Sequence, residues 1–324
     1  MGAAVFVPLA AGMTLFLAGL RVMEFALHRW AGGWLSRALE TFTKTPLRGL
    51  VSGTVLTAAV QSSTAVTVMT VGLVNAGVLR FPQTLGVILG ANVGTCLTTE
   101  LIGISPDRFA APLLVAGAAL WAASIAAAQT RLGRAAYRRV RSAGFAALAL
   151  VGFAAILYGM NLMTSIVPAL ESGALFQSFV ELASQSALLG VVAGAALTAV
   201  VQSSAAVIGL AMGLAEGGAI DVPLGIAVTL GANIGTCSTA LLAAFGGSRA
   251  SRFVAWTHVW LNVAGTILFY PFIGQLAQWT ALLADDPAVR IAHAQTIFNV
   301  VCSLVALPVC YLPAVRKMRP DDRP

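Results

Sequence analysis

Charged residues are scarce in this chain of 324 residues, and so are the residue types that build most catalytic and metal sites. Asp, Glu, Lys and Arg make up 10% of the sequence, whereas a soluble domain has roughly 25%. The 4 cysteines follow neither a disulfide nor a zinc spacing, so we expect them to be packing residues. Acid–base pairs, activated nucleophiles and metal-ligand clusters are missing as sequence patterns, so we expect neither an enzyme nor a cofactor.

Hydrophobic residues, by contrast, make up 58% of the chain. Seven apolar stretches are long enough to cross a hydrocarbon core of roughly 30 Å as helices. We therefore predict an all-α polytopic membrane protein with the lipid bilayer as its surroundings. The first stretch lacks a basic leader and an obvious cleavage site, so we expect it to be retained as a span. The stretches are 4–27, 82–104, 108–130, 143–168, 223–246, 252–275 and 290–313.

The sequence also contains an internal duplication. Residues 53–99 align without a gap onto residues 194–240, and 23 of the 47 positions are identical. Most identities are small or polar: Gln-Ser-Ser at 61–63 returns at 202–204, and the Gly-Ala-Asn motif that starts at 90 returns at 231. A duplicated block that keeps its amides and hydroxyls in an apolar chain predicts two halves of one polar site inside a membrane.

Weaker similarity extends the duplication in both directions and defines two units. Residues 1–130 form the first unit and residues 143–275 the second, each in the order helix, interrupted segment, helix, helix. The interrupted segments, about 47–79 and 187–220, are predicted as re-entrant helical hairpins with Gln-Ser-Ser at their tips. An extra transmembrane helix at 290–313 and a cytoplasmic tail at 314–324 follow the second unit.

Basic residues determine the predicted topology. The net charge of +7 would suit nucleic acid, but Lys and Arg lie in short segments between spans, so we expect no nucleic-acid partner. With both interrupted segments as hairpins, 16 of the 19 basic residues fall on one side, including five arginines in a loop at 131–142. The positive-inside rule makes that side cytoplasmic, with the N-terminus outside and the C-terminus inside. Three crossings per unit, an odd number, then make the two units inverted-topology repeats.

The Gln-Ser-Ser segments are the main candidates for substrate and ion binding. Their amide and hydroxyl oxygens suit a hard cation such as Na⁺ without a buried carboxylate. An isolated membrane serine usually bonds back to its own helix, but a duplicated triplet in opposed halves favours a binding role. The candidates are Gln61, Ser62, Ser63, Thr64, Gln202, Ser203 and Ser204, with Na⁺ placed at Gln61, Ser62, Gln202 and Ser203.

A second candidate element combines two glycines with an Asn and a Thr partway along an apolar helix. A helix that breaks there would expose N–H groups for an anion and carbonyls for a cation, so we predict a discontinuous helix in each unit. The alternative is that the glycines only permit close helix packing. The candidate ligands are Asn92, Thr95, Asn233 and Thr236, and one turn further on Thr98 and Thr239 are candidates of the same type.

Three single residues outside these motifs could contribute to the site. We predict that His258 and His293 form interhelical hydrogen bonds, in preference to acting as proton relays. Three interpretations of Arg21 are open: its side chain extends to the cytoplasmic interface, it pairs with Glu24, or it binds the substrate anion. Its counterpart in the second unit is the neutral Asn161, which argues against the substrate role.

These motifs resemble the sodium/phosphate cotransporter family, the bacterial relatives of the type II Na⁺/phosphate transporters. The likeness covers about residues 10–305 and is carried by the runs 61–79 and 85–95 and by their second copies. It implies that the Gln-Ser-Ser segments lie on opposed re-entrant hairpins that bind Na⁺ and phosphate, beside discontinuous helices. Family members often have a third serine there, where this chain has Thr64 and Ala205. Many bacterial members also carry a C-terminal regulatory domain, which we expect this chain to lack.

The resemblance implies a symporter of the cell inner membrane that takes up inorganic phosphate with Na⁺ by alternating access. Phosphate, Na⁺ and lipid are then the expected partners, with a homodimer as a further expectation and Na⁺ as coupling ion. Three competing functions stay open: the same fold carrying another oxyanion or a carboxylate, the same fold driven by H⁺, and a phosphate sensor without net transport. A membrane enzyme acting on lipid is disfavoured by the missing acid–base groups.

Overall fold

The computed structural model describes residues 2–32, 34–76, 78–79, 81–104, 109–130, 133–171 and 173–313. Across these residues the regular structure is helical, without strands. Arg80, Arg108, Arg131 and the predicted tail at 314–324 lie outside the described residues, so the topology predicted from them stays a prediction. The α-helices of the first half are α1 (Gly2–Ala31), α2 (Trp34–Phe42), α3 (Pro46–Val60), α4 (Ser63–Asn75), α5 (Phe81–Ile104) and α6 (Ala110–Ala128).

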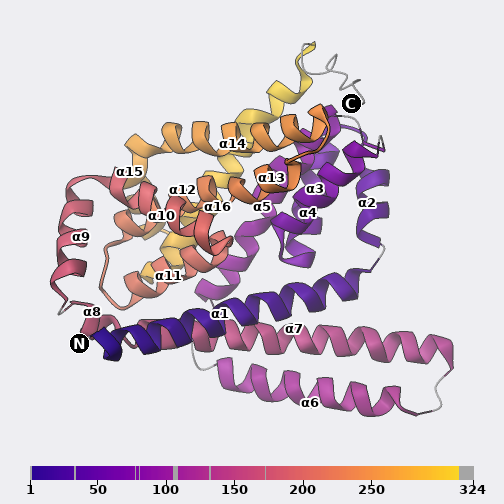
Figure 1. Cartoon of the computed structure of the whole chain (residues 1–324), viewed down its shortest axis with the longest axis horizontal. Helices are drawn as coiled ribbons and strands as arrows, with labels where there is room; N and C mark the ends of the chain where they lie inside the picture. The colour runs from indigo at the N-terminus through magenta and orange to yellow at the C-terminus, as the bar shows by residue number, and fades with distance from the viewer. Residues whose placement is uncertain are drawn as a thin grey trace.

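The second half repeats this order with small insertions, and Figure 1 shows the whole arrangement. Its α-helices are α7 (Arg134–Thr164), α8 (Val167–Glu171), α9 (Ala174–Gln185), α10 (Ala187–Val201), α11 (Ser204–Glu216), α12 (Val222–Gly235), α13 (Cys237–Ala244) and α14 (Arg249–Phe269). The short helix η2 (Tyr270–Phe272), α15 (Ile273–Ala281), α16 (Pro287–Ala306) and η3 (Leu307–Tyr311) follow.

Seven helical segments of the described chain have the length and hydropathy of membrane spans, one for each predicted stretch. The prediction of an all-α polytopic membrane protein is therefore confirmed. One boundary was wrong: the segment predicted as a loop at 131–142 is mostly helix, because α7 begins at Arg134. Ala and Arg are strong helix formers, so the helix extends beyond its apolar part and carries its arginines on its first turns.

Both interrupted segments fold as two short helices that break at the glutamine of Gln-Ser-Ser. The helices before the break have 15 residues and those after it have 13, in both halves. A 15-residue helix is roughly 22 Å long, which is shorter than the roughly 30 Å hydrocarbon core. Neither half-helix is long enough to span a bilayer alone, which is the property that a re-entrant hairpin needs.

The discontinuous helix predicted in the first unit is absent, because α5 runs without a break from Phe81 to Ile104. The glycines of this segment serve the alternative use, close packing. A Cβ on Gly90 would overlap the carbonyl oxygen of Leu50, and one on Gly94 would lie 2.6 Å from the Thr54 carbonyl oxygen. In the second unit the helix is interrupted by one residue, since α12 ends at Gly235 and α13 begins at Cys237.

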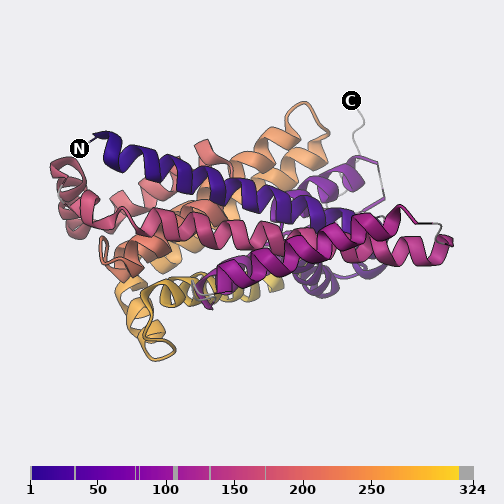
Figure 2. The ribbon, with the colours of Figure 1, turned by 90° about the horizontal axis from the view of Figure 1, so that it is seen from below.

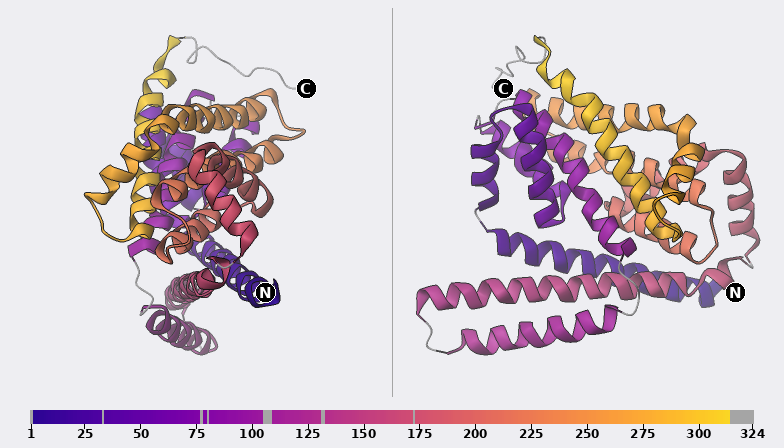
Figure 3. Two further views of the ribbon diagram at one scale, coloured as in Figure 1. Left: turned by 90° about the vertical axis from the view of Figure 1, so that its left-hand side faces the viewer. Right: turned by 180° about the vertical axis from the view of Figure 1, so that it is seen from behind.

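The first helices of the two units, α1 and α7, pack along each other and form one side of the molecule with α6 (Figures 2 and 3). Their contacts are reciprocal under the 140-residue offset of the duplication. Cβ atoms on Gly12 and Gly19 would lie 2.9 and 2.6 Å from the carbonyl oxygens of Gly159 and Gly152 respectively. Gly152 is the counterpart of Gly12, and Gly159 that of Gly19, so these helices contact as a two-fold axis requires. The inverted repeat stays a prediction that this reciprocity supports.

A short helix that the sequence pattern did not reveal precedes each hairpin. α2 and α9 begin 140 residues apart and are therefore counterparts. In α2 the buried residues Leu35, Ala38 and Leu39 pack against the hairpin residues Leu56 and Val60. Such an amphipathic helix suits the membrane interface, where it can support the base of a hairpin.

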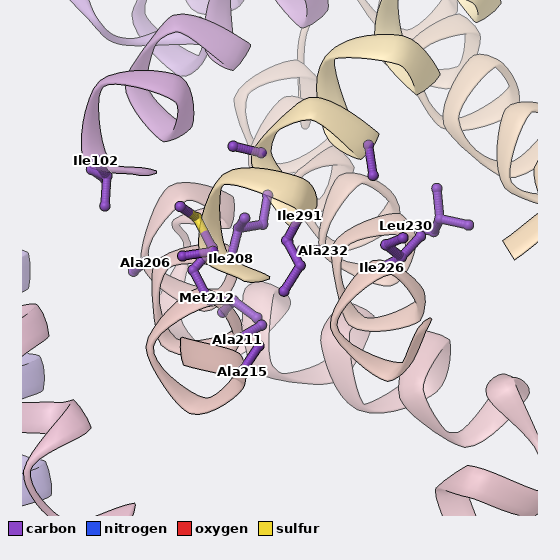
Figure 4. Packing of buried hydrophobic residues seen from close by; sticks show 14 of the residues in the cluster. Ile102, Ala206, Ile208, Ala211, Met212, Ala215, Ile226, Leu230, Ala232 and Ile291 are labelled. Atoms are coloured by element: carbon purple, nitrogen blue, oxygen red, sulfur yellow. The ribbon is translucent and has the colours of Figure 1, made fainter. Parts of the chain in front are cut away.

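The main hydrophobic core surrounds the second hairpin. Helix α11 is buried on nearly all sides, and Ile208 and Met212 are inaccessible to solvent. Figure 4 shows these side chains next to Ile291 of α16, in a cluster that also includes Ile226 of α12 and Ile102 of α5. The second Gln-Ser-Ser turn is thus carried by a helix that the protein, not lipid, surrounds, which is where broken backbone is tolerated in a membrane.

Candidate functional site

Each Gln-Ser-Ser turn is built around a glutamine in the left-handed conformation. Gln61 has φ 56° and Gln202 has φ 59°, and they are the two non-glycine residues with positive φ in the described part of the chain. Each glutamine caps the helix before it. The N–H of Gln61 donates to the carbonyl of Thr57, and its side-chain amide donates to that of Ala58. Gln202 makes the same two bonds to Thr198 and Ala199. A left-handed non-glycine residue is uncommon, so its recurrence in both turns marks a special site.

The two glutamines differ in their second side-chain contact. The Thr98 hydroxyl donates a 2.7 Å hydrogen bond to Oε1 of Gln61, and both groups are buried. The amide nitrogen of Gln202 instead donates to Ser238 at 3.0 Å, while the hydroxyl of Thr239 donates to the Thr236 carbonyl of its own chain segment. The first turn is therefore fixed by a buried partner that the second turn lacks.

The serine after each glutamine starts the next helix. Ser62 is the N-cap of α4 and accepts a hydrogen bond from the N–H of Ala65, and Ser203 has the same relation to Ala206 in α11, both at 3.3 Å. The first N–H groups of a helix have no partner within it, and its dipole places positive potential there. The two turns thus present two helix N-termini, which are suited to an anion.

Both turns line one cavity of about 800 Å³. The predicted ligands in its wall are Gln61, Ser62, Ser63, Thr64, Thr95, Gln202, Ser203, Ser204 and Thr236, together with Arg21, Thr98 and Thr239. Thr95 and Thr236 donate their hydroxyl protons to carbonyls of their own helices, so their oxygens keep lone pairs for a cation. The structure therefore brings twelve predicted residues from the two halves around one space.

Two predicted ligands, Asn92 and Asn233, lie outside this cavity wall. The side-chain oxygen of Asn92 lies 3.1 Å from Nε2 of His258 on α14, and the amide of Asn233 donates to the Thr229 carbonyl at 2.9 Å. Helix α5 is unbroken, so Asn92 and Thr95 lie on different parts of its surface. Asn92 contacts the neighbouring helix, whereas Thr95 lines the cavity. The expectation that His258 forms an interhelical hydrogen bond is confirmed.

Helix α1 adds charge to the cavity that the duplicated motifs did not predict. Arg21 and Glu24 form an ion pair at 3.5 Å, as one of the interpretations of Arg21 expected. Both line the cavity, and Ser62 of the first turn lies in the same wall. In the sequence, Arg21 and Glu24 are neighbours on one face of a helix. Their proximity to the first Gln-Ser-Ser turn, about 40 residues later, follows from the packing of α1.

Further polar groups join the helices around the site. His293 on α16 lies 3.1 Å from a carboxylate oxygen of Glu100 on α5, which also accepts a 2.5 Å bond from Thr296, so the interhelical role expected of His293 is confirmed. The hydroxyls of Thr57 and Thr198 are buried one turn before the two glutamines, and within the described residues they have no hydrogen-bond partner. Sequence reasoning missed these two, although they are counterparts in the duplication.

The two turns supply neutral oxygens and N–H groups, and the charge in the cavity wall comes from α1. The described residues contain no group of three or more His, Cys, Asp or Glu side chains that could hold a metal ion, and all four cysteines are free. Hydroxyl and amide oxygens suit an alkali cation, whereas helix N-termini and Arg21 suit an anion. The cavity can therefore take a cation and an anion together.

Comparisons with known proteins identify relatives along the whole chain. A family profile described as Na⁺/Pi-cotransporter matches residues 15–165 and again residues 155–283, once for each half. The uncharacterized protein YqeW of Bacillus subtilis is 34% identical over 308 residues, which is 95% of each chain. No solved structure matches the chain.

Two more distant relatives have names that describe an activity. The putative inorganic phosphate export protein YjbB of Escherichia coli is 24% identical over 301 residues, which cover 93% of this chain but 53% of its own length. The sodium-dependent phosphate transport protein 2B of Bos taurus is 40% identical over 87 residues, 26% of this chain and 13% of its own. The chain therefore spans about half of the first of these and matches a short part of the second.

Proposed function

Because the chain belongs to the Na⁺/Pi-cotransporter family, whose members are transporters and not enzymes, we propose that it moves inorganic phosphate together with Na⁺. The observation that carries this proposal is the meeting of the two Gln-Ser-Ser turns, one from each half of the chain, in a single cavity. A transport site shared by two repeats can be opened to either side by moving one repeat against the other.

Phosphate is held between the two turns in this proposal. The N-termini of α4 and α11 supply N–H groups and positive potential, and the hydroxyls of Ser62 and Ser203 supply further donors. Arg21 and Arg29 also line the cavity, and the Glu24 carboxylate offsets one of their two charges. The net charge of +1 from these three side chains does not neutralise a dianion, so bound Na⁺ is expected to supply the remaining positive charge.

Sodium is coordinated by the oxygens beside the turns. Gln61 and Gln202 bring amide groups, Thr95 and Thr236 bring hydroxyl oxygens, and Thr64 brings one that Ala205 lacks. The unpartnered hydroxyls of Thr57 and Thr198 lie one turn before the glutamines and extend the oxygen set. Because Na⁺ and phosphate attract each other in one cavity, each raises the affinity for the other, and this reciprocal effect is the coupling.

The ion pair between Arg21 and Glu24 regulates this coupling. Phosphate competes with Glu24 for the guanidinium, and the released carboxylate stays in the wall of the cavity that Ser62 also lines, where it stabilises Na⁺. The pair has no charged counterpart in the second half, where Asn161 and Thr164 occupy the equivalent positions. The two halves therefore contribute unequally to the shared site.

Membrane orientation and direction complete the proposal. We place the protein in the cell inner membrane with the N-terminus outside and the C-terminus in the cytoplasm, following the positive-inside rule. With an inward Na⁺ gradient, transport is uptake. The relative YjbB is named a putative inorganic phosphate export protein, and this name supports the opposite direction, export. Transport of another oxyanion, coupling to H⁺, and sensing without net flux are the competing functions that the test below separates from Na⁺-coupled phosphate transport.

The test is uptake of radiolabelled phosphate by the purified protein in liposomes. An inward Na⁺ gradient is expected to drive accumulation, and choline in place of Na⁺ at constant pH is expected to abolish it. Ser62→Ala is expected to reduce Na⁺-dependent uptake strongly. Ser52→Ala is the matched control, because this serine lies on the same hairpin but its hydroxyl donates to Arg48 of its own helix. Equal uptake in Na⁺ and choline would exclude sodium coupling, and equal loss in the two variants would exclude the site.

A further inference from the structure

A second cavity, of about 510 Å³, lies between α1 and α7 beside the central one. We call it the basic pocket, and its charged or titratable lining residues are His28, Arg29, Arg138 and Arg141. The remaining lining residues are Trp30, Gly32, Ser142 and Phe145, so no acidic side chain is among the described residues that line it. Three arginines around one hollow without a carboxylate leave a strong positive potential there.

Two of the three guanidinium groups of this pocket lie over aromatic rings. Arg29 lies over the ring of Phe25 at 5.3 Å from its centroid, and Arg141 lies over the ring of Phe145 at 5.6 Å. The two rings contact each other edge to face at 6.4 Å, across the interface of α1 and α7. Arginines that only extend toward the membrane surface would not need this arrangement. Stacking leaves the N–H edges of a guanidinium free, and it reduces the entropy lost when they bind.

The basic pocket adjoins the central cavity. His28 and Arg29 line both spaces. An anion in the basic pocket therefore lies next to the cavity that the Gln-Ser-Ser turns line, at the end of α1 that carries His28 and Arg29 in its last turn.

We infer that the basic pocket is a second anion site, separate from the transport site, which binds a phosphate group bearing two negative charges. Arginine forks match the oxygens of phosphate in pairs, and two stacked forks facing one hollow suit a dianion better than a single carboxylate. The group is either free inorganic phosphate or the phosphomonoester head of an anionic lipid, since both present the same oxygens. This site does not require transport, so it stands or falls independently of the proposed function.

The test measures phosphate binding without Na⁺, by the full chain in nanodiscs of phosphatidylcholine at low ionic strength. Wild-type protein is expected to bind radiolabelled phosphate in choline buffer. The variant Arg138→Gln with Arg141→Gln removes two guanidiniums that do not line the central cavity, and its Kd is expected to rise by about tenfold for each one lost. The matched control, Arg134→Gln with Arg139→Gln, makes the same charge change at exposed positions of the same helix and is expected to bind like wild type.

Three further measurements make the result decisive. Arg138→Lys with Arg141→Lys keeps the charge but loses the fork, so its affinity is expected to fall between those of the wild type and the Gln variant. A Ser62→Ala variant is expected to keep Na⁺-independent binding, which separates this site from the transport site. In a second arm, nanodiscs containing phosphatidic acid are analysed by native mass spectrometry.

Each outcome then has one meaning. Loss of free-phosphate binding in the Arg138/Arg141 variant alone supports the site with phosphate as ligand. Absence of free-phosphate binding, with retention of phosphatidic acid by wild type and control but not by this variant, supports it with lipid as ligand. If the Arg138/Arg141 and Arg134/Arg139 variants behave alike toward both probes, the inference is overturned. Failure of Na⁺-driven uptake by wild-type protein would refute the proposed function and leave this result unchanged.

Discussion

Replacing Thr98 with valine is expected to impair Na⁺ binding, whereas the same change at its counterpart Thr239 is expected to have little effect. Valine has nearly the shape of threonine but cannot donate a hydrogen bond. In the structure the Thr98 hydroxyl donates to Gln61 at 2.7 Å, whereas the Thr239 hydroxyl donates to a carbonyl of its own segment and not to Gln202. Thr98 is therefore a positioning residue for the first turn.

The magnitude follows from the burial of this bond. Thr98 is 3% exposed and Gln61 is 9% exposed, so the glutamine oxygen loses its donor in a nearly dry place. An acceptor left without a partner in a protein interior costs about 1–3 kcal/mol. Because the cavity lets some water reach Gln61, we expect the lower part of this range, about 1–1.5 kcal/mol, which corresponds to roughly five- to tenfold weaker Na⁺ binding. For Thr239→Val we expect less than about twofold, since surface-like local bonds contribute little.

The assay is the Na⁺ concentration that gives half-maximal phosphate uptake in proteoliposomes, measured for both variants at saturating phosphate. Thermal unfolding of each purified variant checks that the fold is kept. Equal shifts for Thr98→Val and Thr239→Val, or a larger shift for Thr239→Val, would refute the reasoning. Either result would mean that the threonines act as symmetric ligands and that the bond to Gln61 does not position the turn.

Two more predictions test the charge on α1 and the helix packing. Glu24→Gln removes the partner of Arg21. In the Arg138→Gln/Arg141→Gln background, where the basic pocket is weakened, phosphate binding without Na⁺ is therefore expected to tighten about two- to fivefold, as suits a solvent-accessible pair; unchanged or weaker binding in equilibrium dialysis would show that Glu24 does not compete with phosphate. Gly90→Ala places a methyl group against the Leu50 carbonyl and is expected to cost at least about 1–3 kcal/mol of stability. Gly72→Ala places its methyl group in open space within a helix and is expected to stabilise the protein by about 0.5–1 kcal/mol. Thermal midpoints of the Gly90→Ala and Gly72→Ala variants that shift in the same direction would contradict the packing account.

The sequence predicted the parts of the site that depend on local chemistry. Gln-Ser-Ser interrupts an apolar segment twice, and polar groups retained in such a segment need a buried or wet place, so the turns at Gln61 and Gln202 could be predicted from the pattern. The same holds for the seven spans, which depend on length and hydropathy alone.

Features that depend on neighbouring helices could not be predicted in this way. Gly90 and Gly94 look like a helix break in the sequence, but their use is set by the carbonyls of α3, which approach α5 too closely for any side chain. Asn92 was predicted to face the site because its type suits a ligand, whereas the orientation of α5 places it against His258. Glu24 was visible only as a neighbour of Arg21, because its place in the cavity wall with Ser62 arises from the packing of α1 against the hairpin.

The central claim is that the two Gln-Ser-Ser turns form one site, and a double-mutant cycle tests it most directly. Phosphate binding at fixed Na⁺ is measured for wild type, Ser62→Ala, Ser203→Ala and the double variant. Groups that share one ligand are expected to be non-additive by more than about 0.5 kcal/mol, so the double variant should bind little worse than the more damaging single variant. Additive losses within about 0.3–0.5 kcal/mol would show two independent sites and would contradict the account.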